Sequence, residues 1–283
     1  MNILFSTEST ADLSPELIER YKIAVMPLYV EKGGKTYRDG VDINVQDIFE
    51  YVDAGNPICG TAALNVEDYI KFFKEKAPLY DAVIQTTISS DFSSCYQNAC
   101  IAAEEFPNVY VVDSRNLSTG ISHVILEGIR KSGTTDDIEE ILAYMREVTA
   151  KVDTSFVIKT LSYLAKGGRC SSVTALGANL LKLRPVIEVV DGKMRVGKKY
   201  RGAYPKCVVN YVVDRLKERK DNDELLYDRI FITHAYATDE TVAAVRKAVE
   251  EAGAFAEILE THAGCTISSH CGPECLGILF IRK

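Results

Sequence analysis

The sequence predicts an α/β protein in two parts: a larger α/β part over residues 1–155 and a smaller α+β part over residues 156–283. In the first part, short apolar runs typical of buried parallel strands alternate with helical segments. After residue 150 hairpin signals mix with helices, which is typical of a separate α+β layer. The length of 283 residues also favours two domains over one.

The elements of the first part follow from hydrophobic periodicity and from helix cap signals. Gly33-Gly34 is the expected turn of a small hairpin. The expected strands are 2–6, 23–30, 81–88 and 109–113, and the expected helices are 14–21, 45–54, 65–76, 93–105, 119–131 and 135–150.

In the second part, Asp191-Gly192 is a strong signal for a tight hairpin. Strand 186–190 should therefore pair antiparallel with strand 193–201. The other expected strands are 154–159, 229–234, 256–261 and 275–281, and the expected helices are a short one before Lys166 and those at 172–182, 206–219 and 239–252.

Composition excludes several classes of function. The net charge of −7 argues against nucleic acid as the main partner, because phosphate binding needs a basic face. No segment approaches the roughly 20 apolar residues of a membrane span. The chain begins directly with a predicted strand, without a basic leader or a cleavage site. We therefore expect a cytoplasmic protein whose eight cysteines are reduced.

Hydroxyl side chains gather where apolar runs give way to polar, helix-like segments. Ligands of open α/β sheets bind outside the carboxyl ends of the strands, so neighbouring strands of this kind would build a pocket lined by hydroxyls. Such a pocket suits holding a ligand better than transforming it, because it lacks the usual general acids and bases. Ser and Thr are also common helix caps, so any one cluster has that simpler explanation. The clusters are Ser6 to Thr10, Thr86 to Ser94, and Ser114 with Ser118-Thr119.

The segment from Lys166 to Ser172 places glycines, cations and hydroxyls before a predicted helix, which suits an anion at a helix N-terminus. It lacks the glycine spacing and the Lys-Ser/Thr ending of a nucleotide-binding P-loop. A helix C-cap glycine followed by an N-cap serine is the favoured interpretation.

The C-terminal run contains several potential zinc ligands, but their spacing includes no Cys-x2-Cys pair and fits no zinc motif. We therefore expect no metal site. Cys275 opens an apolar strand and is expected to be a small core residue. His270 is expected in a loop between strands, where polar residues tend to serve function. The potential ligands are His262, Cys265, His270, Cys271 and Cys275.

Residues 182–206 form a basic segment in an acidic protein. One explanation is an exposed hairpin whose lysines protect a sheet edge. The other is a docking face for an acidic or phosphate-bearing partner. The segment contains Lys182, Arg184, Lys193, Arg195, Lys198, Lys199, Arg201 and Lys206, opposed only by Glu188 and Asp191.

Taken in order, these segments resemble the DegV family, which includes the fatty-acid-binding subunits of bacterial fatty acid kinase. The resemblance covers essentially the whole chain, and the run from Thr160 to Arg169 is its most specific piece. The other pieces are Ser9 to Leu13, Met26-Pro27-Leu28, Thr36 to Gly40, Thr61, Ile88 to Ser93, Val112-Asp113-Ser114, Leu183-Arg184-Pro185, Asp191-Gly192, His270 and Gly272-Pro273.

The resemblance implies a Rossmann-like three-layer domain and a smaller α+β domain, with a long-chain fatty acid in a pocket between them. It implies that Thr61 and Ser93 hold the carboxylate, with His270 nearby. It implies further that Arg201 serves docking of a kinase catalytic subunit, which phosphorylates the bound acid. This chain would then be a binding subunit without a cofactor or catalytic residues of its own.

A second hypothesis is a serine hydrolase or acyltransferase that uses Ser93 as nucleophile and His270 as base. It is the weaker one, because Ser93 lies in no Gly-x-Ser-x-Gly elbow. The chain also departs from the family pattern around the expected carboxylate site: Glu8 replaces an Asp, Ala62-Ala63-Leu64-Asn65 replaces Ser-Gln-Pro-Ser, and Ser94-Cys95 replaces Gly-Thr.

Overall fold

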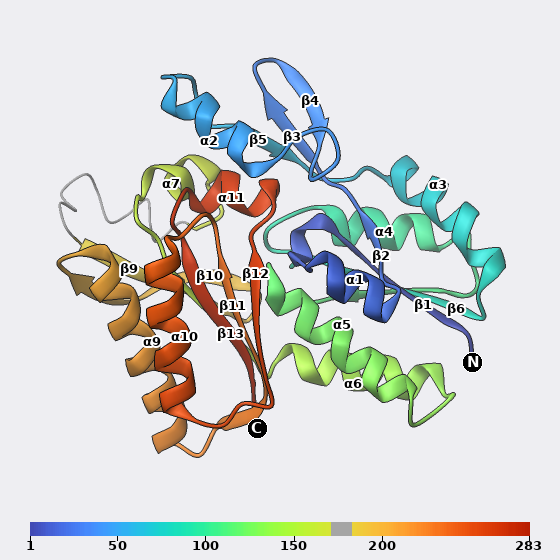
Figure 1. Ribbon diagram of the computed structural model, residues 1–283. Helices are drawn as coiled ribbons and strands as arrows, with labels where there is room; N and C mark the ends of the chain where they lie inside the picture. The colour runs from blue at the N-terminus through green and yellow to red at the C-terminus, as the bar shows by residue number, and fades with distance from the viewer. Residues whose placement is uncertain (171–182) are drawn as a thin grey trace.

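The computed structural model describes residues 1–170 and 183–283 and contains three β-sheets (Figure 1). The helix expected over 172–182 lies outside the described residues. Within them, no helix combines the length and the low polarity that crossing a membrane requires.

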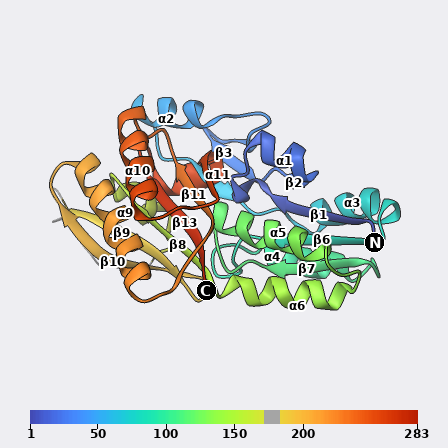
Figure 2. The same ribbon diagram turned by 60° about the horizontal axis from the view of Figure 1, so that its bottom comes forward.

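The first sheet has four parallel strands in the order β2-β1-β6-β7, which confirms the predicted parallel arrangement. Two pairs of helices cover its two faces, α3 with α4 on one and α5 with α6 on the other (Figures 1 and 2). The elements are β1 Ile3–Glu8, η1 Ser9–Ala11, α1 Pro15–Tyr21, β2 Ala24–Met26, α3 Val66–Lys76, η2 Ala77–Leu79, β6 Ala82–Thr87, α4 Cys95–Ala103, β7 Val109–Asp113, α5 Thr119–Ser132 and α6 Ile138–Thr149.

The single strand expected over 23–30 is wrong. The chain leaves the first sheet after β2 and enters a separate antiparallel sheet of order β4-β3-β5. Pro27 lies at this break, and a proline cannot donate to a strand ladder. The Gly33-Gly34 turn is confirmed, since it joins β3 Tyr29–Lys32 to β4 Lys35–Arg38. The sheet is completed by β5 Gly60–Ala62, and α2 Val45–Asp53 precedes it in the chain.

The third sheet has six mixed strands in the order β10-β9-β8-β13-β11-β12. The hairpin of β9 and β10 around Asp191-Gly192 is confirmed, and both turn residues have positive φ, as a type I′ turn requires. Its elements are β8 Val152–Val157, α7 Ser162–Gly167, β9 Leu183–Val190, β10 Lys193–Arg201, α9 Tyr204–Asp221, β11 Leu225–His234, α10 Asp239–Ala252, β12 Glu257–His262, α11 Cys265–Cys271 and β13 Leu276–Arg282.

The six-stranded sheet buries both of its faces. One face packs with α9 and α10 around side chains such as Val157 and Ile278. The other presents Phe156 and Leu279 to the N-terminal part, where α5 packs against it. Helix α5 also contacts β6 of the parallel sheet, so it lies between the two sheets and its sequence is buried on all sides over most of its length.

Candidate ligand-binding site

Helix α11 carries His270, so the expectation that His270 lies in a loop is wrong. The reason is that the start of α11 is held by side chains distant in the sequence. Gly264 at the N-cap offers no side-chain cap, and its N–H donates to Asp12 at 2.7 Å. Asp39 accepts the N–H groups of Cys265 and Thr266 at 2.8 and 2.9 Å. Two buried carboxyl groups of the N-terminal part therefore satisfy the open end of a helix in the C-terminal part.

The His270 ring lies between Thr61 of β5 and α7. Its Nε2 is 2.8 Å from Oγ1 of Thr61. Its Nδ1 lies against Gly167, where a Cβ atom would come within 2.2 Å of it, so the ring occupies space that only glycine leaves open. Burial, with the Arg169 charge nearby as a second cause, lowers the pKa of His270 to about 4. The ring is therefore neutral at neutral pH.

Ser93 lies at the end of the loop between β6 and α4. Its hydroxyl donates to the thiol of Cys95 at 3.2 Å and accepts the Cys95 N–H at 3.3 Å. The loop is anchored from two sides: the N–H of Ile88 donates to Glu8 at 2.9 Å, and the hydroxyl of Ser89 donates to the carbonyl of Gly192 at 2.8 Å. The tip of the β9–β10 hairpin thus supports the loop that carries Ser93.

Glu8 is a buried carboxyl group behind this loop. Tyr69 of α3 donates its hydroxyl to Glu8 at 2.6 Å, and Thr10 donates at 3.3 Å. Burial raises the pKa of Glu8 to about 7, against the lowering effect of these hydrogen bonds. Glu8, which stands where the family pattern has Asp, therefore holds both helix α3, through Tyr69, and the loop that carries Ser93, through Ile88.

Thr61, Ser93 and His270 line one cavity between the two parts of the chain. The space in it that is open to the centres of water molecules is about 210 Å³, and one buried water needs only roughly 10–15 Å³ by that measure. Both parts supply apolar walls, with Leu28, Ile88 and Phe92 from the first and Phe156, Met194 and Leu279 from the second. The cavity is large enough for an extended apolar ligand with a polar end.

Arg169 also lines this cavity, a role that the sequence interpretation of its segment missed. Its guanidinium donates to the carbonyls of Phe92 and Gly167 at 3.3 and 2.8 Å. The first half of the favoured interpretation is confirmed, because Gly168 ends α7 in the left-handed conformation. The N-cap serine expected after it lies outside the described residues. The glycine pattern predicts the helix end, but it says nothing of where the next side chain points.

Comparison with known proteins assigns the chain to a family. The family model described as "uncharacterised protein, DegV family" matches residues 3–283. The chain belongs to the DegV family. A DegV domain-containing protein of Caldanaerobacter subterraneus is 30% identical, with 99% of each chain covered.

Solved DegV structures have the same fold. A DegV family protein from Thermus thermophilus, described as fatty acid binding, is 29% identical and has a TM-score of 0.90, with both chains fully covered. DegV of Bacillus subtilis, described as a fatty acid binding protein, is 25% identical with a TM-score of 0.86, again over the full length of both. The predicted fold class is confirmed.

The hydroxyl clusters have divided roles in this DegV protein. Ser93, Ser94 and Ser118 line the cavity. The cluster from Ser6 to Thr10, which spans the end of β1, makes internal hydrogen bonds instead: Ser6 donates to Gln85, and Ser9 donates to Asp39. The remaining cavity hydroxyls lie outside the three clusters and belong to Thr61, Thr154, Thr233 and Thr266. Of these, only Thr61 is expected at the site from the family resemblance.

The C-terminal Cys and His residues do not converge on one point. Cys265 is buried and contacts the carbonyl of Ile43 at 3.4 Å, Cys271 and Cys275 are buried in the cavity wall, and His262 is exposed elsewhere. Arg201 lies at the exposed end of β10 and does not line the cavity.

Proposed function

We propose that this protein binds a long-chain fatty acid in the cavity between its two parts, with the carboxylate at Thr61, Ser93 and His270. The observation that carries the proposal is that these three side chains, far apart in sequence, line one otherwise mainly apolar cavity. The descriptions of the Thermus and Bacillus relatives as fatty acid binding support the same ligand class.

The physics of the cavity supports such a ligand. Burying a chain of about sixteen carbons stabilises the complex by roughly 0.8 kcal/mol per methylene, on the order of 10 kcal/mol before ordering costs. A buried carboxylate needs several hydrogen bonds to offset its lost hydration. The two hydroxyls supply donors, and Arg169 places a cation at the same wall. The N-terminus of α4, directly after Ser94, also favours a negative charge.

The hydrolase hypothesis is not favoured by the hydrogen bonds. The Nε2 atom of His270 contacts Thr61, whereas the hydroxyl of Ser93 is engaged with Cys95. Among the described residues, the Nδ1 atom of His270 has no hydrogen-bond partner, so no carboxylate orients the ring as a general base requires.

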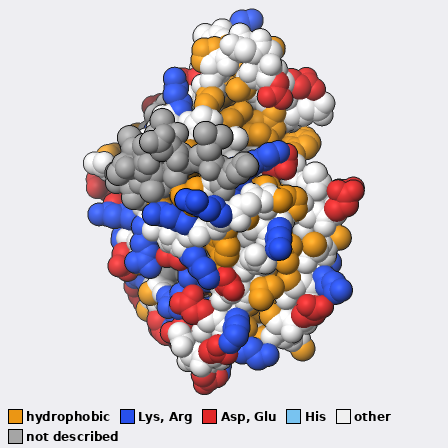
Figure 3. Space-filling view, turned by 90° about the vertical axis from the view of Figure 1, so that its left-hand side faces the viewer, with side chains coloured by type: hydrophobic (Ala, Val, Ile, Leu, Met, Phe, Trp, Pro, Cys, Tyr) orange, Lys and Arg blue, Asp and Glu red, His pale blue; other side chains and the backbone are white. Residues whose placement is uncertain are grey.

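The bound acid is, in this proposal, presented to a separate kinase that phosphorylates its carboxylate. Lys and Arg side chains gather on the face that carries β9, β10 and α9 (Figure 3). Lys199 and Arg201 are exposed there, near the end of β10. Exposed charge of this kind speeds association with an acidic or phosphate-bearing partner. In this proposal, presentation of the acid requires no cofactor on this chain.

Ligand binding is tested first. Native mass spectrometry of the purified protein should show a co-purified fatty acid. Ser93→Ala and Thr61→Val should each weaken binding by about 1.5–3 kcal/mol, roughly 10- to 150-fold, because each removes a hydrogen bond to a charged group. Ser132→Ala, which removes a hydroxyl at the far end of α5, is the control. Unchanged affinity in both cavity variants would contradict the head-group assignment.

Partner docking is tested separately. Arg201→Ala should leave fatty-acid affinity nearly intact and lower the rate at which a cognate fatty acid kinase phosphorylates the bound acid. Added salt should lower the wild-type rate as well. Lys247→Ala removes an exposed charge from α10 and serves as the control. A loss of lipid binding in Arg201→Ala would place this residue at the ligand rather than at a partner.

A further inference from the structure

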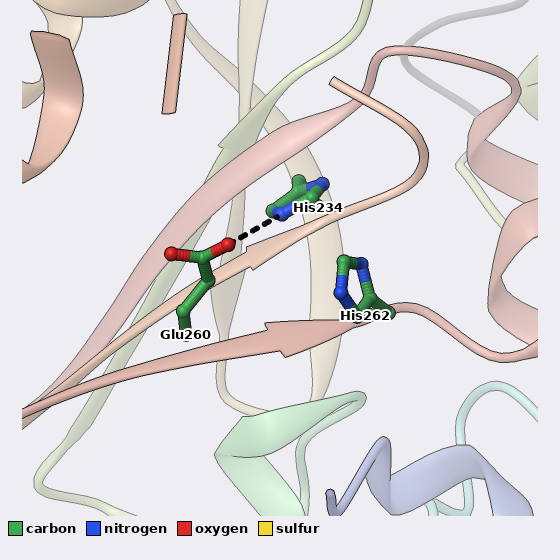
Figure 4. A group of neighbouring side chains, drawn as sticks. All are labelled: His234, Glu260 and His262. Carbon is green, nitrogen blue, oxygen red and sulfur yellow. Dashed lines mark ion pairs between the residues drawn. The ribbon is translucent and has the colours of Figure 1, made fainter. Parts of the chain in front are cut away.

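Two histidines and a glutamate meet at the edge of the six-stranded sheet (Figure 4), and one of them, His234, also lines the cavity described above. His234 ends β11 and His262 ends β12, and the two are direct partners in the parallel pairing. Glu260 precedes His262 by two residues, so it lies on the same face of β12. Among the described residues, these are the only His, Cys, Asp and Glu side chains grouped closely enough to share a metal ion.

The geometry is close to that of a zinc site. The Nε2 atom of His234 is 3.5 Å from Oε1 of Glu260, and one ligand atom from each of the three residues lies within 4.8 Å of the others. Zinc bond lengths of about 2.0–2.2 Å place tetrahedral ligand atoms roughly 3.3 Å apart. His262 and Glu260 are exposed, so modest rotations of their side chains can close the remaining gap.

The hydrogen bonds leave the required atoms open. His234 is only 5% exposed, and the nearest partner of its Nε2 is Oε1 of Glu260 at 3.5 Å, longer than an ordinary hydrogen bond. Arg246 of α10 donates to Oε2 of Glu260 at 3.2 Å, which orients the carboxylate and leaves Oε1 facing the histidines. A buried ring nitrogen whose nearest partner is this distant is unusual in a native structure, and an ion between the nitrogen and the carboxylate would satisfy both.

We propose that His234, Glu260 and His262 form a zinc-binding site whose fourth position is taken by water. Two imidazoles and one carboxylate suit zinc, whereas calcium and magnesium prefer oxygen ligands. Binding through Nε2 of His234 places the ring proton on Nδ1. The N–H of Ala237 donates to this Nδ1 at 3.3 Å, and the site gives up that long hydrogen bond when zinc binds.

The position of the ligands explains why the sequence does not predict the site. His234 precedes the Cys- and His-rich C-terminal run, and only the pairing of β11 with β12 brings it to His262. A bound ion would cross-link the edge strand β12 to its neighbour. It would therefore raise the melting temperature of the protein in proportion to site occupancy.

The test is zinc binding to chelator-treated full-length protein, measured by isothermal titration calorimetry with a thermal-shift readout. The wild type should bind one equivalent. His262→Ala and Glu260→Gln should each weaken binding by at least about tenfold, since even loss of an outer partner of a metal ligand has that effect. Glu251→Gln, which changes an exposed carboxylate of α10, is the matched control and should bind like the wild type.

Cobalt substitution separates this site from the eight cysteines. The cobalt-loaded protein should show ligand-field bands without thiolate-to-metal charge transfer, and these bands should be lost in His262→Ala. Three outcomes would each overturn the proposal: no zinc binding by the wild type, binding by both site variants as tight as that of the wild type, or a thiolate charge-transfer band. Neither variant alters the fatty-acid cavity residues Thr61, Ser93 or His270, so failure here leaves the proposed lipid binding untouched.

Discussion

Replacing Asp39 with alanine is expected to loosen the start of helix α11 and to destabilise the whole protein. The Asp39 side chain is 4% exposed and accepts three hydrogen bonds. They come from the hydroxyl of Ser9 at 3.0 Å and from the N–H groups of Cys265 and Thr266. The substitution leaves two buried backbone donors without a partner.

The magnitude follows from those two donors. An unsatisfied buried donor costs about 1–3 kcal/mol, and loss of a helix cap costs about 0.5–2 kcal/mol. The two figures describe overlapping effects, so Asp39→Ala should lower the free energy of unfolding by about 2–4 kcal/mol. Because α11 carries His270, fatty-acid affinity should fall as well.

Urea denaturation followed by circular dichroism measures this effect. Asp42→Ala is the matched control, because Asp42 is exposed and its pair with Arg38 at 2.8 Å is a surface salt bridge worth less than about 1 kcal/mol. The midpoint should fall clearly for Asp39→Ala and little for Asp42→Ala. If the two variants unfold at the same urea concentration as the wild type, the carboxylate does not hold the helix.

Three further outcomes are expected. The pKa of His270 is lowered from 6.5 to about 4 in the folded state, so its contribution to stability is complete above pH 6.5 and is lost as the pH falls toward 4. Across this range, the free energy of unfolding from urea denaturation should fall further for the wild type than for His270→Gln, by up to about 3 kcal/mol. Gly277→Ala should destabilise by about 1–3 kcal/mol in the same assay, because its Cβ would lie 2.6 Å from the carbonyl of Ser155 and 2.8 Å from Cβ of Phe156. Tyr211→Phe should cost about 1–3 kcal/mol by thermal and urea unfolding, because it leaves the Ser155 carbonyl, 2.6 Å from its hydroxyl, without that partner.

Local signals explain the parts of the fold that the sequence predicts. The strands β1 and β6 begin with short apolar runs and are buried on both faces, and such runs are visible without any knowledge of their neighbours. The hairpin at Asp191-Gly192 is likewise encoded in two adjacent residues that adopt positive φ.

Features that depend on distant contacts are not visible in the sequence. Helix α11 has only seven residues and no side-chain cap of its own, so its start is encoded by Asp12 and Asp39 more than 200 positions earlier. Arg169 lines the cavity because α7 ends just before it, at Gly167. Hydrophobic periodicity does not predict the direction of a side chain that follows a helix end. Spacing rules fail for these residues because spacing describes one element at a time.

The shared cavity wall limits how this chain can be recombined with its relatives. Leu28 and Ile88 face a space whose opposite side is built by Phe156 and Leu279. In a chimera joined near residue 150, one set of these side chains would come from a relative only 30% identical. Their volumes would no longer match, and mismatched volumes change the size of a cavity or strain it. Such a chimera would therefore alter the length of ligand it accepts, although no mutation had been aimed at the cavity. Exchanging residues on the outer face of α6 or α10 would not change the length of ligand that the cavity accepts.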